Sequence, residues 1–334
     1  MVLAQIERRG SRLLVVLSVV LMMFLSGCAT RIPLSSLVPA QHDMSSYQIL
    51  LLHTIEPYRF SLSDEPARRV EDFSARAPVQ VYSGYQPFSG RSVASTVFAT
   101  LENQLADSPF ITVTQNWERT VGVGARAQLS VQISNIDITE YIYAKGDEDS
   151  LAFNLHQQVQ LTLVYQVSDI DTHTVIHRGT VHTSEEQTYT LDTDSSQVIF
   201  APSLGPVLEG LAKEAAQALA YRLVPRERIL HVALLKSGRG SHELFDEAYD
   251  DAKENPQEAF NRFNRLFREY GDARAGYNAA ILAEAMGSRE KAYALMEKVV
   301  NTGEVSRAQR QWERMQRTLE QHLEAQEQIQ GRGE

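Results

Sequence analysis

The feature that most restricts the fold is the run Leu151–Val167, in which apolar and polar side chains alternate. A period of two places alternate residues on opposite faces of a β-strand. One face would carry Phe153, Leu155, Val159, Leu161, Leu163, Tyr165 and Val167, and the other Asn154, His156, Gln158, Gln160 and Thr162. Burial of a single face is typical of an antiparallel sheet with one wet side. The turn Asp169–Thr174 and a strand over Val175–Thr188 would complete a hairpin.

The residues around this hairpin predict a mixture of strands and helices. Strands are expected over 47–53, 110–114 and 127–143, the last with a β-bulge near Ser134-Asn135, where the alternation changes phase. Amphipathic helices are expected over 92–106, with Ser92 as N-cap, and over 204–223, ended by Pro225. We therefore predict an α+β domain over residues 46–235, with an antiparallel or mixed sheet and two helices on one face.

Only helical patterns follow this domain. The stretch Lys-Ser-Gly-Arg-Gly-Ser at 236–241 is typical of a linker, and helices are expected over 242–253, 256–270, 273–286, 289–301 and 306–328. The sequence thus predicts an all-α domain over residues 242–328.

The amino-terminal end has the pattern of an export signal. Three arginines (Arg8, Arg9 and Arg12) precede an apolar run from Leu13 to Leu25. This run is shorter than the about 20 residues that a membrane-spanning helix needs, so we expect residues 1–27 to be a signal peptide. Cys28 follows directly and is the only cysteine of the 334-residue chain, which therefore has no disulfide within it.

Leu25-Ser26-Gly27-Cys28 resembles the bacterial lipobox. The resemblance implies that Cys28 is acylated on its sulfur, that cleavage occurs before it, and that acyl chains such as palmitate hold the chain on a membrane. Ala29, in place of an aspartate, implies transfer to the outer membrane, with the protein facing the periplasm. Residues 29–45, which include Pro33 and Pro39 and have no periodicity, are expected to form an irregular tether, so 28–45 would be a lipidated tether.

The phrase "VQLTLVYQVSDIDTHTVIHRGTV" and the order of elements around it resemble the CsgG-like and TolB amino-terminal group of periplasmic domains. Asp171 and Thr172 match the hairpin tip of that group, and His173 takes the place of its glycine. Histidine tolerates a left-handed backbone better than most residues, so the resemblance implies that the turn is kept.

"ARAGYNAAILAEAMGSREKAYALMEKVV" resembles tetratricopeptide repeats, with Tyr277, Ala280, Gly287, Ala292 and Val299 near the positions of that repeat. Ala259 precedes Ala292 by 33 residues, close to the period of about 34. The resemblance implies a concave groove lined by the first helix of each pair. Arg274 and Asn278 are one turn apart on such a helix and could contact the backbone or a carboxylate of a partner; an ordinary solvated helix face is the alternative.

No motif for catalysis, a cofactor or a metal ion is found. His173, His177 and His182 lie near the hairpin, but His177 and His182 are an odd number of residues apart and would face opposite sides of a strand. Gly122-Val-Gly124 lacks the rest of a nucleotide fingerprint. The formal net charge of −10 disfavours a nucleic-acid partner. We expect no enzymatic activity, no cofactor and no metal site.

These features predict a periplasm-facing lipoprotein that acts as an adaptor or scaffold in an envelope assembly. The alternative is a ring-forming secretion or pore lipoprotein of the CsgG-like kind, since the predicted hairpin is long. The identity of the protein partner and the degree of self-association stay open.

Overall fold

The computed structural model contains two compact units. The sheet unit comprises Pro39–Arg226 with Glu324–Glu334, and the helical unit comprises Met1–Val38 with Glu227–Leu323. Within them the structure describes residues 29–57, 67–70, 80–83, 90–108, 111–116, 118, 124–145, 152–191, 198–201, 203–239 and 241–330. The predicted signal peptide, the cleavage motif and Cys28 lie outside these ranges. Among the described helices, none combines the length and hydropathy that crossing a bilayer requires.

The sheet unit is built on a mixed sheet with the strand order β5-β2-β6-β7-β8. At one side, β2 (Ile49–Leu52) is parallel to both β5 (Thr112–Thr114) and β6 (Arg126–Lys145). β3 (Ala67–Val70) also pairs in parallel with β6, further along that strand. A separate parallel pair joins β4 (Gln80–Ser83) to β9 (Val198–Ala201).

The predicted hairpin is confirmed. β7 (Ala152–Asp169) is antiparallel to β6 on one side and to β8 (Val175–Leu191) on the other. The register between β6 and β7 shifts between Ile133 and Asn135, where the sequence predicts a bulge. Because of this shift, Ile133 and Ile136 are both buried although they are three positions apart, an odd number that would place them on opposite faces of a regular strand.

The turn between β7 and β8 is held by Asp169. Its Oδ1 accepts hydrogen bonds from the N–H of Thr172 at 2.7 Å and of Asp171 at 2.9 Å. The bond from the Thr172 backbone contributes most to lowering the pKa of the Asp169 carboxyl, because hydrogen bonds favour the ionised form. His173 has φ 57°, so it adopts the left-handed conformation that the sequence predicts.

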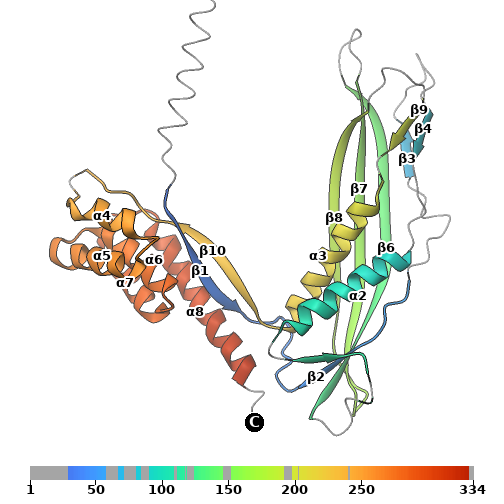
Figure 1. The fold of residues 1–334 in the computed structure, drawn as a ribbon, viewed down its shortest axis with the longest axis horizontal. Coiled ribbons are helices and arrows are strands. Elements are labelled where there is room, and N and C mark those ends of the chain that lie inside the picture. The colour runs from blue at the N-terminus through green and yellow to red at the C-terminus, as the bar shows by residue number, and fades with distance from the viewer. Residues whose placement is uncertain are drawn as a thin grey trace, which may run out of the picture. The chain divides into compact units, whose positions relative to one another are not determined.

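Two helices, α2 (Gly90–Ala106) and α3 (Gly205–Leu223), cover one face of the sheet (Figure 1). Their apolar side chains share one buried cluster with alternate residues of β7, and this cluster includes Val97, Leu101, Leu208, Leu211, Leu161, Leu163 and Val167. The α+β arrangement with two helices on one face is thereby confirmed. The prediction of Ser92 as N-cap is wrong, because α2 begins at Gly90 and Ser92 lies inside its first turn.

The helical unit contains α4 (Leu244–Asp251), α5 (Pro256–Tyr270), α6 (Ala273–Ala285), α7 (Arg289–Thr302) and α8 (Ala308–Gln330). Each lies within two residues of a predicted helix.

Capping residues and glycines explain where these helices begin and end. Asn255 and Asp272 cap α5 and α6, and Gly271 (φ 69°) and Gly303 (φ 71°) end α5 and α7 in the left-handed conformation. At Gly276 the helices approach so closely that a Cβ would lie 2.7 Å from Cγ2 of Val299.

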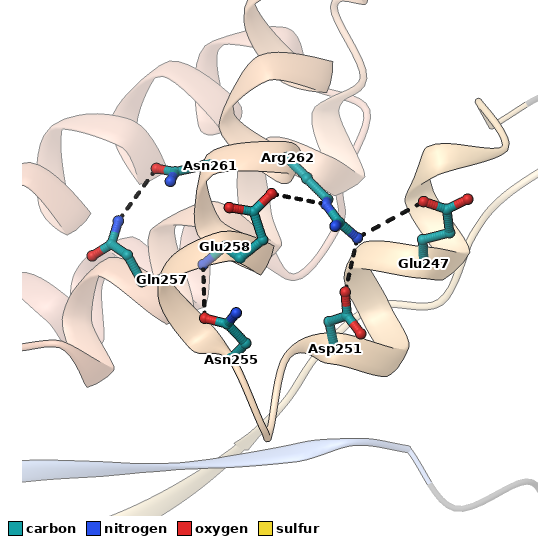
Figure 2. Close-up of polar contacts among 7 residues, drawn as sticks. All are labelled: Glu247, Asp251, Asn255, Gln257, Glu258, Asn261 and Arg262. Atoms are coloured by element: carbon teal, nitrogen blue, oxygen red, sulfur yellow. Dashed lines mark hydrogen bonds and ion pairs between the residues drawn. The ribbon is translucent and has the colours of Figure 1, made fainter.

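Arg262 joins α4 to α5 (Figure 2). Its Nη1 lies 2.8 Å from Asp251 Oδ2 and 3.8 Å from Glu247 Oε2 on α4, and its Nε lies 3.1 Å from Glu258 Oε1 on α5. Asn255 Oδ1 accepts the N–H of Glu258, the first half of a capping box. These side chains are partly exposed, so each pair contributes only about 0–1 kcal/mol, and the apolar contacts beneath them hold the helices together.

The prediction of an irregular tether over 28–45 is wrong for Arg31–Val38, which form strand β1. Ile32 and Leu34 alternate with exposed residues and are buried in the core of the helical unit. β1 pairs with β10 (Arg226–Ala233) in a two-stranded ribbon. Leu234 N–H donates to Thr30 O at 2.8 Å, and Ser35 Oγ bonds Glu227, so the two strands run in opposite directions. Pro33 is tolerated because proline can occupy an edge strand.

Because of the β1–β10 ribbon, the boundary between the two units differs from the predicted domain boundary. Since β10 pairs with β1 and not with the main sheet, the sheet unit ends at Arg226 and not at the predicted residue 235. Residues 236–241, predicted to be a linker between domains, lie within the helical unit.

An ion pair buried in the helical unit joins α6 to α8. Arg314 Nη1 donates to Glu284 Oε1 at 2.7 Å and Nη2 to Oε2 at 2.5 Å. Glu284 is only 5% exposed, so its charge depends on this two-point contact. Nearby Tyr277 is fully buried, and burial raises the pKa of its hydroxyl.

Glu284→Ala is expected to lower the free energy of unfolding of the helical unit by about 3–5 kcal/mol, because the largely buried guanidinium of Arg314 would lose its carboxylate and keep only the amide oxygen of Gln311. The measurement is urea unfolding of the full chain followed by Trp312 fluorescence in a Trp117→Phe background, which leaves one tryptophan. Glu269→Ala, which breaks the exposed pair with Arg265, is the matched control and should leave the urea midpoint nearly unchanged. Equal losses in the two variants would contradict this role of Glu284.

Candidate functional site

The two residues predicted to contact a partner, Arg274 and Asn278, both lie on α6 but differ in exposure. Arg274 is exposed, whereas Asn278 is 0% exposed. Asn278 Nδ2 donates to the carbonyl of Leu235 at 2.8 Å, and its Oδ1 accepts the N–H of Leu235, also at 2.8 Å. The side-chain amide thus binds an extended main chain at two points, as a neighbouring β-strand would. That main chain belongs to the protein itself, so the prediction that Asn278 contacts a partner is wrong.

Arg274 binds the same segment one residue further on. Its Nη1 donates to the carbonyl of Lys236 at 3.1 Å. A Cβ at Gly238 would lie 3.0 Å from Arg274 Nε, so the guanidinium runs closely past that glycine. Helix α6 therefore holds residues 235–238 against itself through main-chain groups, which many sequences could supply.

Two adjoining cavities open beside this segment and share Arg274 and Glu304. The first, of about 330 Å³, is also lined by Lys236 and by Val305, Ser306 and Arg307 from the α7–α8 loop. The second, of about 560 Å³, is also lined by Arg239, His242, Tyr270 and Asp272. We call these two cavities the α6 groove. Their volumes lie in or near the range of ligand sites, but their lining is polar, which suits a solvated segment better than an apolar ligand.

The α6 groove carries a surplus of positive charge on an acidic protein. Lys236, Arg239, Arg274 and Arg307 line it together with the carboxylates of Asp272 and Glu304. The Asp272 carboxylate is already engaged, because it accepts the N–H groups of Arg274 and Ala275 as the N-cap of α6. For Arg307, the described part of the chain holds no ion pair or hydrogen bond to its side chain. A chain with net charge −10 thus presents a local site for anionic groups.

Sequence reasoning found Arg274 but missed Arg239, Glu304 and Arg307. All three lie in irregular segments, between β10 and α4 or between α7 and α8. Irregular segments have no periodicity from which the direction of a side chain could be predicted. Only the number of charged residues near the predicted helix ends could have indicated these three residues.

The three hairpin histidines have separate surroundings. His173 occupies the turn, His177 stacks on His42 with ring centroids 4.4 Å apart, and His182 Nδ1 lies 3.0 Å from Thr162 Oγ1. Among the described residues, no set of three potential ligands is arranged to hold a metal ion.

Asn278→Ala is expected to destabilise the helical unit by about 2–4 kcal/mol, because the N–H and carbonyl of Leu235 would lose both partners in a partly buried place. The single-tryptophan urea unfolding described above measures this loss. Asn261→Ala, at an exposed asparagine of α5 that accepts a hydrogen bond from Gln257, should change stability by less than about 0.5 kcal/mol. If the two alanine variants are equally stable, Asn278 does not hold the segment.

No family model and no curated protein matches the chain. Among solved structures, a Xanthomonas campestris protein assigned to the family model DUF330 is 14% identical, with 55% of this chain and 87% of that chain covered and a TM-score of 0.27. The PelC dodecamer of Paraburkholderia phytofirmans is 14% identical, with 58% and 98% covered and a TM-score of 0.21. A Caulobacter crescentus chain named as a candidate lipoprotein is 15% identical, with 38% and 77% covered and a TM-score of 0.19. All three TM-scores lie below 0.5, so these likenesses assign neither a fold nor a function to this chain.

Proposed function

We propose that this chain is a non-enzymatic lipoprotein, anchored at the periplasmic face of the outer membrane, that serves as an adaptor in an envelope assembly. The motif Leu25-Ser26-Gly27-Cys28 supports the anchor. The α6 groove supports the binding of a second protein.

The observation that carries the proposal is the way α6 binds residues 235–238. Asn278 and Arg274 form hydrogen bonds with main-chain groups of this segment, at distances of 2.8 and 3.1 Å. Recognition of main chain by side chains one helical turn apart does not depend on the sequence that is bound. A partner segment lying beside residues 235–238 would meet both Arg274 and Arg307, since both line the same cavity.

The charge of the groove defines the partner: a segment rich in carboxylates. Each exposed ion pair contributes about 0.2–1 kcal/mol, so single contacts with Arg239 or Arg307 would bind weakly. An adaptor fixed to a membrane needs little intrinsic affinity, because attachment of both proteins to one surface raises their effective concentration. Weak, salt-sensitive recognition by the α6 groove is therefore compatible with an adaptor.

The membrane anchor is tested with Cys28→Ser. This variant is expected to leave the membrane fraction and to keep the unprocessed mass, because a hydroxyl does not form the thioether that precedes cleavage. Cell fractionation and intact-protein mass spectrometry measure both effects. Ser26→Ala keeps a small residue before the cysteine and is the matched control, which should remain lipidated. Unchanged attachment of Cys28→Ser would exclude Cys28 as the anchor.

The groove is tested with a fluorescent hexaglutamate peptide. Arg307→Glu is expected to weaken its binding about tenfold, because one attraction becomes a repulsion, and binding to the unmodified chain should weaken with salt. Fluorescence anisotropy gives the affinities. Arg310→Glu makes the same charge change at an exposed residue of α8 that does not line the groove, and it should weaken binding less than about twofold. Equal losses would mean that the peptide senses net charge and not the groove.

The ring-forming alternative is favoured by one observation. In the described part of the chain β8 pairs only with β7, so its outer edge, 17 residues long, is left for another strand. A second copy could extend the sheet there. Light scattering of the lipidated chain in mild detergent separates the two functions, because the alternative requires one species of many subunits.

A further inference from the structure

The sheet unit contains a cluster of polar and charged side chains that neither proposed function uses. It holds the segment Ala40–Met44, in which Ala40 and Met44 are buried. His42, between them, has its Nε2 2.7 Å from the hydroxyl of Tyr165 on β7, and its ring stacks on that of His177 on β8. The backbone N–H of His42 donates to the carbonyl of Arg222 on α3 at 2.8 Å.

Tyr165 and Arg222 form the buried side of this cluster. Tyr165 is 1% exposed, and its hydroxyl also accepts a hydrogen bond from Arg222 Nη1 at 3.3 Å. The same Nη1 donates to the carbonyl of Thr180 at 2.9 Å, which fixes the guanidinium beside β8. The site is closely packed, since a Cβ at Gly179 would lie 2.6 Å from the Tyr165 hydroxyl. We call His42, Tyr165, His177 and Arg222 the histidine clasp.

The charges that face His42 all have the same sign. His177 faces it from β8 and Arg222 from α3, while Tyr165 on β7 contributes only a hydroxyl. The main chain of Asp43 contributes its carbonyl, 3.3 Å from His177 Nε2. Among the described residues no carboxylate acts on His42, so a proton on His42 would add a positive charge beside the guanidinium of Arg222, which bonds the same Tyr165 hydroxyl. Partial burial first, then His177 and Arg222, lower the pKa of His42 below its ordinary value of 6.5.

We propose that the histidine clasp is an acid-sensitive latch, which holds Ala40–Met44 on the sheet unit at neutral pH and releases this segment when His42 becomes protonated. All four residues of the clasp belong to the sheet unit, and two segments of the clasp lie close in sequence to its ends. Ala40–Met44 follows the boundary at Val38/Pro39, and Arg222 precedes the boundary at Arg226/Glu227. The hydrogen bond from the N–H of His42 to the carbonyl of Arg222 joins these two segments of the sheet unit, so release of Ala40–Met44 would break it.

The direction of the pH effect follows from the lowered pKa of His42. The His42 imidazole binds its proton less tightly in the folded state than in the released state, where its pKa has the ordinary value of 6.5. The neutral imidazole therefore stabilises the closed clasp fully above pH 6.5, and this stabilisation is lost as the pH falls from 6.5 through the pKa of the folded state. Acid therefore opens the clasp.

Amide hydrogen exchange of the full chain in mild detergent, resolved by NMR, tests the proposal at the N–H of His42. Between pH 7.5 and 5.5 its protection factor, corrected for the intrinsic exchange rate, should fall by up to about tenfold, since pH 5.5 lies one unit below the ordinary pKa of 6.5. The amide of Leu101 in the core of α2 should keep its protection, which separates local release from global unfolding. His42→Gln can still bond Tyr165 but does not titrate, so its protection should be the same at both pH values.

His182→Gln is the matched control, because His182 lies on the same strand as His177 but contacts Thr162 and not the clasp. It should keep the full pH dependence. An equal fall in His42→Gln, or no fall in the unmodified chain, would overturn the proposal. If His42→Gln does not fold, NMR titration of the His42 imidazole in the unmodified chain decides: a midpoint below 6.5 supports the latch, and one at or above 6.5 overturns it.

Discussion

Burial of a single face of β7 is the constraint on which the sheet unit depends. Leu161, Leu163 and Val167 lie under α2 and α3, and their sequence neighbours face away. A slip of one residue would turn every one of these side chains to the opposite face, so the register of β7 fixes the registers of β6 and β8 as well. The bulge between Ile133 and Asn135 follows from this, because without it the distal half of β6 would present its isoleucines to the wrong side.

The helical unit meets a different constraint, the need to satisfy main-chain groups where β10 ends. After Ala233, where β10 ends, the chain no longer continues as a paired strand, yet it still packs on α6. Asn278 substitutes for the missing strand by offering one donor and one acceptor to Leu235. Residues 235–238, held by Asn278 and Arg274, thus cover part of the α6 face that the helical pattern predicts for a partner. The α6 groove lies beside this segment.

Local signals predicted the elements well and the long-range pairings poorly. Asn255-Pro256, Asp272 and the glycines at 271, 287 and 303 mark helix ends by their own conformational preferences. β1 carries no comparable signal, because its alternation is short, contains Pro33, and makes sense only when paired with β10 far along the chain. Asn278 was misjudged for a related reason. A polar residue on an amphipathic helix predicts exposure unless the main chain that it binds is already known.

The α6 groove and the histidine clasp both gather positive charge on an acidic chain, but solvent acts on them differently. Arg239, Arg274 and Arg307 are exposed, so salt screens whatever they attract over about 8–10 Å at ordinary ionic strength. In the clasp, Tyr165 is buried and His42 stacks directly on His177, and charges in direct contact are screened far less. Ionic strength should thus govern the groove and pH the clasp. The helical unit and the sheet unit would then respond independently, one to ionic strength and the other to pH.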